Sequence, residues 1–386
     1  MELKVTKCKD KEITVSLSGR VDSSNARDFE SDMSEILKEH PGKTVFLDLS
    51  SADLITSAGL RVLLRALKQQ TDLRAVNVSD KLYDVFEMTG FTELMLIERP
   101  IRKIVLDEEA VEIGHGANST VYKTAGDLVI KVLREGYDDT AIKKELEKTR
   151  RAFVMGIPTV IPFAIVEVEG KSGLAFELVE ANSLAELLAE DENNLDKYIQ
   201  TYVDTVKQFH NINVDGADKN IFTDSKTQIC KYISELEGKT SPEILEKIKK
   251  IIDDFAVGNQ AIHGDIQPCN LMITDDGPIY IDMDTLSYGN PEFDLVYLYN
   301  TLINFQYVNP MMDFMGISDE LAQKLWDRFV RTYFNSDDDE FIKNKERIYR
   351  PIGLCRLYRW SLKHISDRPD CIAEIRNAFE DAVRNY

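Results

Sequence analysis

The sequence predicts two domains of different fold class: a small α/β domain over residues 1–99 and a larger α+β domain over residues 100–386. Three observations lead to this prediction. The length of 386 residues is enough for two or three ordinary domains. In the first part, short apolar strand patterns alternate with amphipathic helix patterns. The second part begins with closely spaced strand patterns and ends in long helical ones, and the two sets of patterns meet at residues 97–100.

The composition is that of an ordinary globular protein, and it excludes some classes of partner. Hydrophobic residues make up 43% of the chain and charged residues 30%, which provides enough apolar material for sizeable cores. The 67 Asp and Glu residues outnumber the 47 Lys and Arg residues, and of the formal net charge of −20 residues 1–99 carry only −3. Nucleic acids and anionic lipids attract clustered Lys and Arg, so we expect neither a nucleic acid nor a membrane as a partner.

Cysteine usage and the start of the chain lead us to expect a cytoplasmic protein. The five Cys residues are widely spaced and form no pattern typical of a zinc site or a disulfide framework. The first residues contain no apolar signal core. The longest uncharged apolar stretch, Ala152–Val166, is interrupted by Pro158 and Pro162 and is too short to cross a bilayer.

The first domain shows strand and helix patterns in alternation. Ile13, Val15 and Leu17 alternate with polar residues, which predicts a half-buried strand. Residues 22–25 offer a helix start before a helix-compatible segment of about fourteen residues. The remaining elements follow in order: a central strand at 45–49, an amphipathic helix with Leu60, Leu63, Leu64 and Leu67 on one face, a strand at 73–78, a short helix at 81–89 and a closing segment at 94–97.

One loop of this domain carries a specific resemblance. The run LSSADLITSAGL at 49–60 resembles the signature loop of STAS domains, the anti-sigma factor antagonist family, and the segments at 17–22 and 76–91 also fit. The resemblance covers nearly all of residues 1–99 and implies a mixed sheet with packed helices and a regulatory module that binds a protein partner. In regulatory members a partner kinase phosphorylates the Ser that corresponds to Ser57, but the Asp that usually precedes it is Thr56 here.

Two roles for Ser57 follow from its place at the start of a predicted helix. Free amide N–H groups and the helix dipole favour an anion there, so a phosphate would be tolerated locally and would repel an acidic partner. Alternatively, Ser57 or Thr56 only caps the helix. The sequence leaves both roles open.

The second domain opens with a Gly-rich hairpin. Residues 111–123 alternate apolar and polar side chains on both sides of a turn, and residues 128–133 predict a third antiparallel strand. Glycines let backbone N–H groups approach a triphosphate, although hairpins with two glycines also occur without a ligand. The candidate nucleotide-binding residues of this turn are Gly114, His115, Gly116 and Ser119.

The third predicted strand of this domain contains a lysine among apolar residues. Lys131 stands among apolar residues, so it either lies on a solvated face or is held by a specific anion. The helix predicted over 139–151 carries Glu145 and Glu147, and either is a candidate partner. We favour Glu145 because of its distance from the following segment 155–158.

The strongest pattern is HGDIQPCNLM at 263–272. It is followed by a turn at 275–278 and by the strand end at 279–282, which together predict a short hairpin. That hairpin would bring Asn270 and Asp282 beside Asp265. Two oxygen ligands near a carboxylate suit a nucleotide-bound Mg²⁺, and Asp265 would orient an acceptor hydroxyl and take its proton.

This pattern and the later GNPEFDL at 289–295 resemble the aminoglycoside phosphotransferase and choline kinase families, which share the protein-kinase-like fold. The resemblance runs from about residue 105 to 310. It implies a bilobal domain, with an N-lobe at about 100–180 and a C-lobe at about 181–386, and ATP and Mg²⁺ as cofactors. It assigns Asp265 as the catalytic base, Asn270 and Asp282 as Mg²⁺ ligands, and Lys131 as a phosphate contact beneath the loop at 114–119.

The same resemblance assigns further positions. The segment AFELV at 175–179 looks like the hinge whose backbone meets adenine, which makes Glu177 and Val179 candidate nucleotide-binding residues. Asp294 corresponds to the structural Asp of the families, and His263 is interpreted as structural rather than catalytic.

Features of the second domain favour a small-molecule acceptor. Gly264 stands where protein kinases usually have Arg, and the short segment between Asp282 and Pro291 leaves little room to present a peptide. We therefore expect an ATP- and Mg²⁺-dependent phosphotransferase that acts on a hydroxyl of a small cationic molecule, aminoglycoside- or choline-like, with the STAS domain as its regulatory module. The acidic residues 337–340 either attract such a cation or form a solvated surface.

Two alternatives remain at this point. The first is a protein kinase of a signalling switch that phosphorylates Ser57 or a partner protein. The second is a non-catalytic signalling scaffold that binds a nucleotide only as a ligand.

Overall fold

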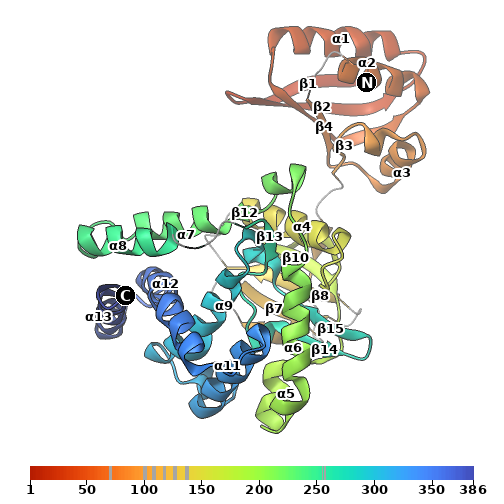
Figure 1. The fold of residues 1–386 in the computed structure, drawn as a ribbon. Helices are drawn as coiled ribbons and strands as arrows, with labels where there is room; N and C mark the ends of the chain where they lie inside the picture. Colours follow the sequence, from red (N-terminus) through yellow and green to blue (C-terminus); the bar gives the residue numbers. More distant parts are fainter. Residues whose placement is uncertain are drawn as a thin grey trace. The chain divides into compact units, whose positions relative to one another are not determined.

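The computed structural model describes residues 1–68, 72–98, 102–106, 110–115, 119–124, 128–134, 139–253, 255 and 258–386. The chain forms two compact units, Met1–Lys103 and Ile104–Tyr386 (Figure 1). The domain boundary expected between residues 99 and 100 lies outside the described residues. Each unit is considered by itself below.

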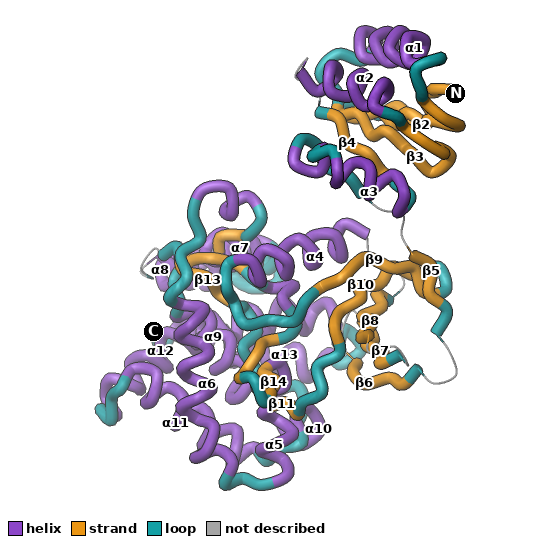
Figure 2. The backbone as a smooth tube through the Cα atoms, turned by 90° about the vertical axis from the view of Figure 1, so that its right-hand side faces the viewer, coloured by secondary structure: helices purple, strands orange, loops and turns teal. Residues whose placement is uncertain are grey.

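The first unit is a mixed sheet with packed helices, in the order β1-β2-β3-β4. β1 pairs antiparallel with β2, whereas β2, β3 and β4 run parallel. Helices α1 and α2 pack side by side (Figure 2). The α/β fold with a mixed sheet is therefore confirmed. Its elements are β1 (Glu2–Cys8), β2 (Glu12–Val21), α1 (Ala26–Glu39), β3 (Thr44–Ile55), α2 (Ser57–Lys68), β4 (Leu73–Val76) and α3 (Asp80–Met88).

The start of α2 packs tightly against the sheet, which explains the glycine of the signature loop. A Cβ at Gly59 would lie 2.7 Å from Cγ1 of Val21 and 2.8 Å from Cγ2 of Ile55. Residue 59 therefore has no room for a side chain. This contact fixes where the exposed Ser57 stands at the helix start.

The second unit begins with a sheet in the order β5-β9-β10-β8-β7-β6. The three strands expected at the start of this domain are present as β6, β7 and β8, in antiparallel pairing. Helix α4 packs against β9 and β10. The bounds are β5 (Arg102–Ile104), β6 (Val111–His115), β7 (Ser119–Lys123), β8 (Leu128–Leu133), α4 (Asp139–Val154), β9 (Pro162–Val168) and β10 (Lys171–Glu177).

The rest of the second unit is mainly helical around one large core, in which Trp326, Tyr349 and Phe379 are fully buried. The predicted hairpin is present as β14 and β15. The elements are β11 (Asn182–Ser183), α5 (Leu184–Glu190), α6 (Asn194–His210), β12 (Thr223–Asp224), α7 (Ser225–Ser234), α8 (Pro242–Asp253), β13 (Gln260–Ile262), β14 (Leu271–Thr274), β15 (Gly277–Tyr280), β16 (Ser287–Gly289), α9 (Glu292–Tyr299), α10 (Met311–Met315), α11 (Asp319–Phe334), α12 (Asp339–His364) and α13 (Pro369–Arg384).

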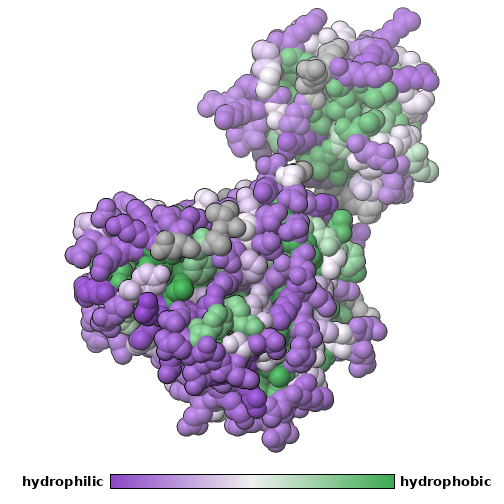
Figure 3. Space-filling view, viewed as in Figure 1, coloured by the Kyte–Doolittle hydropathy of each residue, from purple (hydrophilic) through white to green (hydrophobic). Residues whose placement is uncertain are grey.

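The surface of the second unit is largely polar. On the face drawn in Figure 3, hydrophilic residues cover most of this unit and separate smaller hydrophobic areas. Within the described ranges, none of the helices combines the length and the apolar character that a membrane span requires.

Candidate functional site

The first component of the site is an ion pair between β8 and α4. Side chains alternate between the two faces of a strand, so Lys131 points to the face that packs against α4, where Ile142 is buried. Glu145 lies one helical turn after Ile142, on the same buried face, and Glu147 is exposed. Lys131 Nζ lies 2.8 Å from Glu145 Oε1. The pairing with Glu145 rather than Glu147 is therefore present.

The second component links the same lysine to the segment after β15. Lys131 Nζ lies 2.7 Å from Oδ1 of Asp282. Asp282 has a φ of +64°, in the left-handed region that Asp tolerates better than most residues. Burial alone would lower the pKa of Lys131, but the carboxylates of Asp282 and Glu145 raise it well above its ordinary value. Lys131 therefore stays charged and is shared between two carboxylates.

The third component is Asn270, which joins Asp265 to the neighbourhood of Asp282. The Asn270 side chain is buried, and its Nδ2 donates to the backbone oxygen of Asp265 at 2.9 Å and to Asp265 Oδ2 at 3.1 Å. The backbone N–H of Ile281, the residue before Asp282, donates to the Asn270 carbonyl oxygen at 2.9 Å. The hairpin β14–β15 thus brings the three polar residues together, as its spacing predicts.

These residues offer oxygen atoms to a divalent cation. In the described part of the chain, Asn270 Oδ1 and Asp282 Oδ2 make no hydrogen bond, because Asn270 uses its nitrogen and Asp282 its other oxygen. Amide and carboxylate oxygens are ligands that Mg²⁺ accepts, with phosphate oxygens and water at its other positions. Only one cation, Lys131, lies within ion-pair distance of Glu145 and Asp282 among the described residues. The donor set and the local excess of negative charge both fit Mg²⁺.

The loop that carries Asp265 is held by a buried carboxylate. Asp294 is fully buried, and its oxygens accept from the backbone N–H groups of His263 at 3.0 Å and of Gly264 at 2.6 Å. Its Oδ2 also lies 3.1 Å from Nε2 of His210. His263 Nε2 lies 3.1 Å from the carbonyl oxygen of Ile281. Asp294 and His263 are thus placed to hold the loop, in keeping with a structural role.

Two charged groups near Asp265, Asp284 and Arg356, are not among the site residues that the sequence predicts. Burial raises the pKa of the Asp265 carboxyl, the guanidinium of Arg356 opposes the rise, and Asp282 adds to it. Burial and the charge of Asp282 raise the pKa of Asp284 to about 7, although part of its side chain remains exposed. Lys148 Nζ donates to the carbonyl oxygen of Asp284 at 2.8 Å. Asp284 is the second Asp of the run IDMD at 281–284, so the sequence contained a signal for it. No sequence pattern indicated Arg356.

The expected hinge lies at the end of β10. Glu177 pairs with Leu128 of β8, and its Oε1 accepts from the backbone N–H of Ile161 at 2.6 Å. Val179 packs with the cluster that also contains Ile281, close to the Asp282 segment. The segment therefore borders the same site.

The Gly-rich turn is described only in part. Gly114 and Ser119 lie in the antiparallel pair β6–β7, where Gly114 is opposite Val121 and Ser119 is buried. Gly116 lies outside the described residues, and His115 is described by its backbone alone. The role expected of this turn stays a prediction.

Ser57 of the first unit is exposed at the first residue of α2. The backbone N–H of Thr56 donates to the carbonyl oxygen of Val21 at 2.9 Å, which joins the helix start to β2. Within the described ranges, neither the Ser57 nor the Thr56 hydroxyl makes a hydrogen bond. A capping bond from either side chain is therefore not seen, and the Ser57 hydroxyl is accessible.

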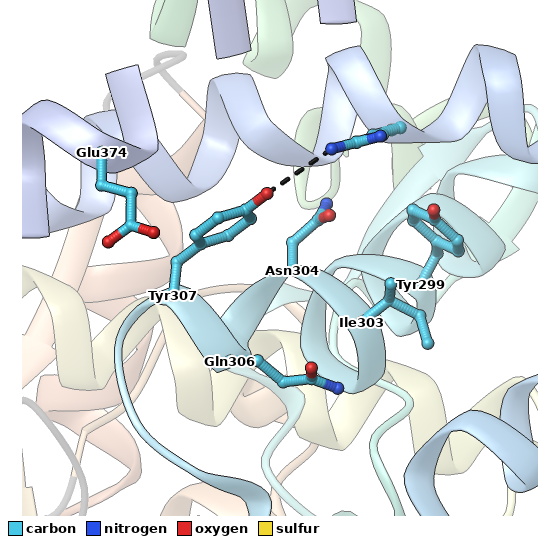
Figure 4. A pocket seen from close by; sticks show the side chains of 7 residues that line it. Tyr299, Ile303, Asn304, Gln306, Tyr307 and Glu374 are labelled. Carbon is cyan, nitrogen blue, oxygen red and sulfur yellow. Dashed lines mark hydrogen bonds between the residues drawn. The ribbon is translucent and has the colours of Figure 1, made fainter. Parts of the chain in front are cut away.

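A separate pocket of about 500 Å³ lies beside the π-helical turn Asn300–Asn304 that follows α9 (Figure 4). Nη2 of Arg350 lies 3.5 Å from the Tyr307 hydroxyl across it. No residue of the Lys131–Asp265 site lines this pocket. Its lining consists of Tyr299, Ile303, Asn304, Gln306, Tyr307, Arg350 and Glu374.

The acidic segment 337–340 has partners within the protein. Asp338 caps α12, since its Oδ1 accepts from the backbone N–H groups of Glu340 at 2.9 Å and Phe341 at 3.2 Å. Asp339 Oδ1 lies 2.7 Å from Nη2 of Arg331. These contacts account for two of the acidic residues without a cationic ligand.

A strand lysine paired with a helix glutamate, set against a loop and hairpin that present Asp265, Asn270 and Asp282, is typical of a kinase-type phosphotransferase. The model of the phosphotransferase enzyme family matches residues 109–335, and the chain belongs to that family. A STAS domain model matches residues 6–98. The chain is thus a phosphotransferase with an amino-terminal STAS domain, as the sequence patterns predict.

Individual proteins similar to parts of this chain are also found. BtrV of Bordetella bronchiseptica, provisionally described as an anti-sigma factor antagonist, is 35% identical over 82 residues, which are 20% of this chain and 70% of BtrV. Among solved structures, the ADP-bound aminoglycoside phosphotransferase APH(2'')-Ib has a TM-score of 0.48 at 16% identity, with 72% of this chain and 94% of that chain covered. A choline/ethanolamine kinase family protein from Mesorhizobium loti has a TM-score of 0.49 at 13% identity, with 73% and 94% covered.

Proposed function

We propose that the chain transfers the γ-phosphate of ATP to a hydroxyl group of a small molecule, with Mg²⁺ and with Asp265 as the catalytic base. The observation that supports this proposal best is the position of Asn270. Its side chain bonds to Asp265 and its backbone bonds to the residue before Asp282. A proton acceptor and two oxygen ligands for Mg²⁺ are thereby held at one point, as phosphoryl transfer requires.

The proposed step forms a bond between the acceptor oxygen and the γ-phosphorus and breaks the bond between that phosphorus and the β–γ bridging oxygen. The hydroxyl proton passes to Asp265, and ADP leaves with the bridging oxygen. The elevated pKa of Asp265, which burial causes, makes its carboxylate a stronger base than an exposed Asp.

The other residues position the nucleotide. Lys131 would contact the phosphates and is itself oriented by Glu145. The turn that includes Gly114 and Ser119 would cover the phosphates, and the backbone at 177–179 would meet adenine. Asn270 and Asp282 would hold Mg²⁺, which neutralises charge on the transferred phosphoryl group.

The cationic character of the acceptor stays a prediction. Its support from sequence was the acidic segment 337–340, but Asp338 caps a helix and Asp339 pairs with Arg331. The nearby Arg356 adds positive charge beside Asp265. A cytoplasmic location also stays a prediction.

The proposal is tested by phosphoryl transfer from γ-labelled ATP with Mg²⁺ and a panel of small hydroxyl compounds. We expect hydroxyl compounds to stimulate ADP formation and to acquire the label, and Asp265→Ala to abolish both. Thermal melting of the variant checks that it folds. ATP binding without transfer to any compound or to the protein would instead indicate a nucleotide-binding scaffold.

A second candidate function concerns the STAS domain, because the Ser57 hydroxyl is exposed and makes no hydrogen bond within the described residues. We propose that Ser57 is a phosphosite through which the domain changes its affinity for a protein partner. Incubation with γ-labelled ATP and no acceptor, followed by peptide mapping, tests whether this chain modifies itself. Label on Ser57 that is lost in both Ser57→Ala and Asp265→Ala supports autophosphorylation, and an unlabelled Ser57 argues against it.

A further inference from the structure

Helix α12 places an arginine directly against the loop that carries Asp265. Nη1 of Arg356 donates to the carbonyl oxygen of Gly264, the residue before Asp265, at 2.8 Å. The guanidinium carbon lies 4.0 Å from the centroid of the Tyr297 ring, in a cation–π contact. Arg356 is thus fixed on two sides, by the loop and by α9.

Arg356 has no carboxylate partner at contact distance. Within the described ranges, no Asp or Glu oxygen lies within 4.0 Å of its guanidinium nitrogens, whereas Arg359, one turn later, lies 2.7 Å from Glu235. A largely enclosed cation without an ion-pair partner is costly, so proteins rarely keep one without a purpose. Asp265 and Asp284 attract Arg356 only from beyond contact distance, so an anion that enters from outside can still bind its guanidinium directly.

A second polar group beside Arg356 also lacks a partner. Tyr297 is only 4% exposed, and its hydroxyl makes no hydrogen bond in the described part of the chain. Tyr297 and Arg356 line one small cavity of about 10 Å³, enough for about one water-sized group. The other lining residues are Gln228, Tyr232, Gly264 and Thr285.

The backbone keeps this cavity open beside the loop. Gly264 has a φ of +82°, and a Cβ there would lie 2.8 Å from the carbonyl oxygen of Thr285. No side chain at residue 264 can therefore supply charge next to Asp265, and Arg356 supplies it from another helix. Gly264 and Asp265 are consecutive, with Cα atoms about 3.8 Å apart. Gly264 lines the cavity and Asp265 is the next residue, so a molecule that reaches both needs only a few bonds between its anionic group and its hydroxyl.

We propose that the acceptor is a small hydroxy acid whose carboxylate is bound by Arg356 and the Tyr297 hydroxyl while its hydroxyl group lies at Asp265. This proposal rests on the proposed function for the transfer step, and it replaces the cationic acceptor expected from the sequence with an anionic one. One carboxylate oxygen matches the size of the cavity, and it would accept a charge-assisted hydrogen bond from Arg356 and a second bond from Tyr297. A carboxylate would give Arg356 a counter-charge in direct contact and would give the Tyr297 hydroxyl the partner that it lacks among the described residues.

Binding is measured by calorimetry on the full chain with Mg²⁺ and a non-hydrolysable ATP analogue. The probes are glycolate, β-hydroxypropionate and γ-hydroxybutyrate, each compared with the amino alcohol of the same length. We expect at least one acid to bind more tightly than its amino alcohol by about tenfold or more, as one charge-assisted hydrogen bond implies. Arg356→Gln should weaken that binding by about tenfold or more, and Arg356→Lys by less.

Two further variants separate recognition from folding. Tyr297→Phe removes one buried hydroxyl at nearly constant volume and should weaken acid binding severalfold without lowering the melting temperature. Arg350→Gln, the same substitution in α12 at a residue that lines the other pocket, should leave acid binding unchanged. Tighter binding of the amino alcohols, or no binding of any acid, would overturn the proposal. So would an acid affinity in Arg356→Gln and Tyr297→Phe that equals that of the unaltered chain.

Transfer is measured separately on the same compounds. If amino alcohols are phosphorylated and acids are not, the hydroxy acid proposal fails and the phosphotransferase function stands. If acids bind through Arg356 but no compound accepts phosphate, the proposed function fails and the carboxylate site stands.

Discussion

Lys131 Nζ and Asp282 Oδ1 lie 2.7 Å apart although 151 residues separate them in the chain. Lys131 comes from β8 of the six-stranded sheet of the second unit, and Asp282 follows the hairpin β14–β15 of the helical part of that unit. Because Lys131 also contacts Glu145 of α4, three elements meet at one ammonium group. The proposed phosphate contact is thus aligned with the proposed Mg²⁺ ligand.

Glu145→Gln is expected to reduce kcat/KM for ATP by about tenfold to a hundredfold, because it removes a charge-assisted hydrogen bond that orients Lys131. Glu147→Gln is the matched control, since Glu147 lies two residues away on the exposed face of the same helix. Steady-state kinetics of both variants check this. Equal losses in the two variants would show that the ion pair has no role in activity.

Asn270→Ala is expected to raise the Mg²⁺ concentration for half-maximal activity by at least about tenfold, because one of two protein oxygen ligands is lost. Chelation of Mg²⁺ should abolish activity in the unaltered chain. Asn344→Ala, at an exposed position of α12, serves as the control. The ligand assignment is wrong if the Mg²⁺ titration of Asn270→Ala overlays that of the control.

Part of the site was predictable because local patterns determine it. The alternation along 128–133 and the buried helix face with Glu145 place that carboxylate opposite Lys131, and the hairpin spacing places Asn270 beside Asp265. Such contacts depend on strand and helix periodicity, which a sequence displays directly.

Other features were not predictable because they depend on distant packing. Arg356 meets Gly264 across 92 residues of sequence, and nothing in the pattern of α12 marks that contact. Strand β1 went unpredicted because its residues are mostly exposed at a sheet edge. The acidic segment 337–340 was considered as a cation attractor, yet helix capping by Asp338 and an ion pair of Asp339 explain two of its residues.

Gly59→Ala is expected to destabilise the STAS domain by about 1–3 kcal/mol, because its Cβ would overlap Val21 and Ile55. Urea unfolding of the chain, followed by hydrogen exchange of the amides of α2, measures the change in the STAS domain. Ser57→Ala, two residues earlier and exposed, should stay within about 0.5 kcal/mol of the unaltered chain. A Gly59→Ala variant as stable as Ser57→Ala would contradict the tight packing of α2.

Cys355 is expected to resist thiol reagents at pH 8 until the chain unfolds. Burial raises the pKa of its thiol to about 12, so the thiol remains protonated at that pH and is also shielded. The exposed Cys8 should react at once, and a Cys8→Ser variant identifies its contribution. Cys355 directly precedes Arg356, so the protection of Cys355 from thiol reagents reports the packing of that part of α12. Reaction of Cys355 as fast as Cys8 would argue against a rigid helix there.

The proposed role of Asp265 as the base is tested by the single-turnover rate of transfer from γ-labelled ATP at saturating Mg²⁺. The acceptor is the best hydroxyl compound of the panel, and the comparison is between the unaltered chain and Asp265→Asn. We expect a loss of about 10²–10⁴-fold, the range for a general base, with nucleotide affinity and melting temperature largely retained. A rate for Asp265→Asn close to that of the unaltered chain would contradict it.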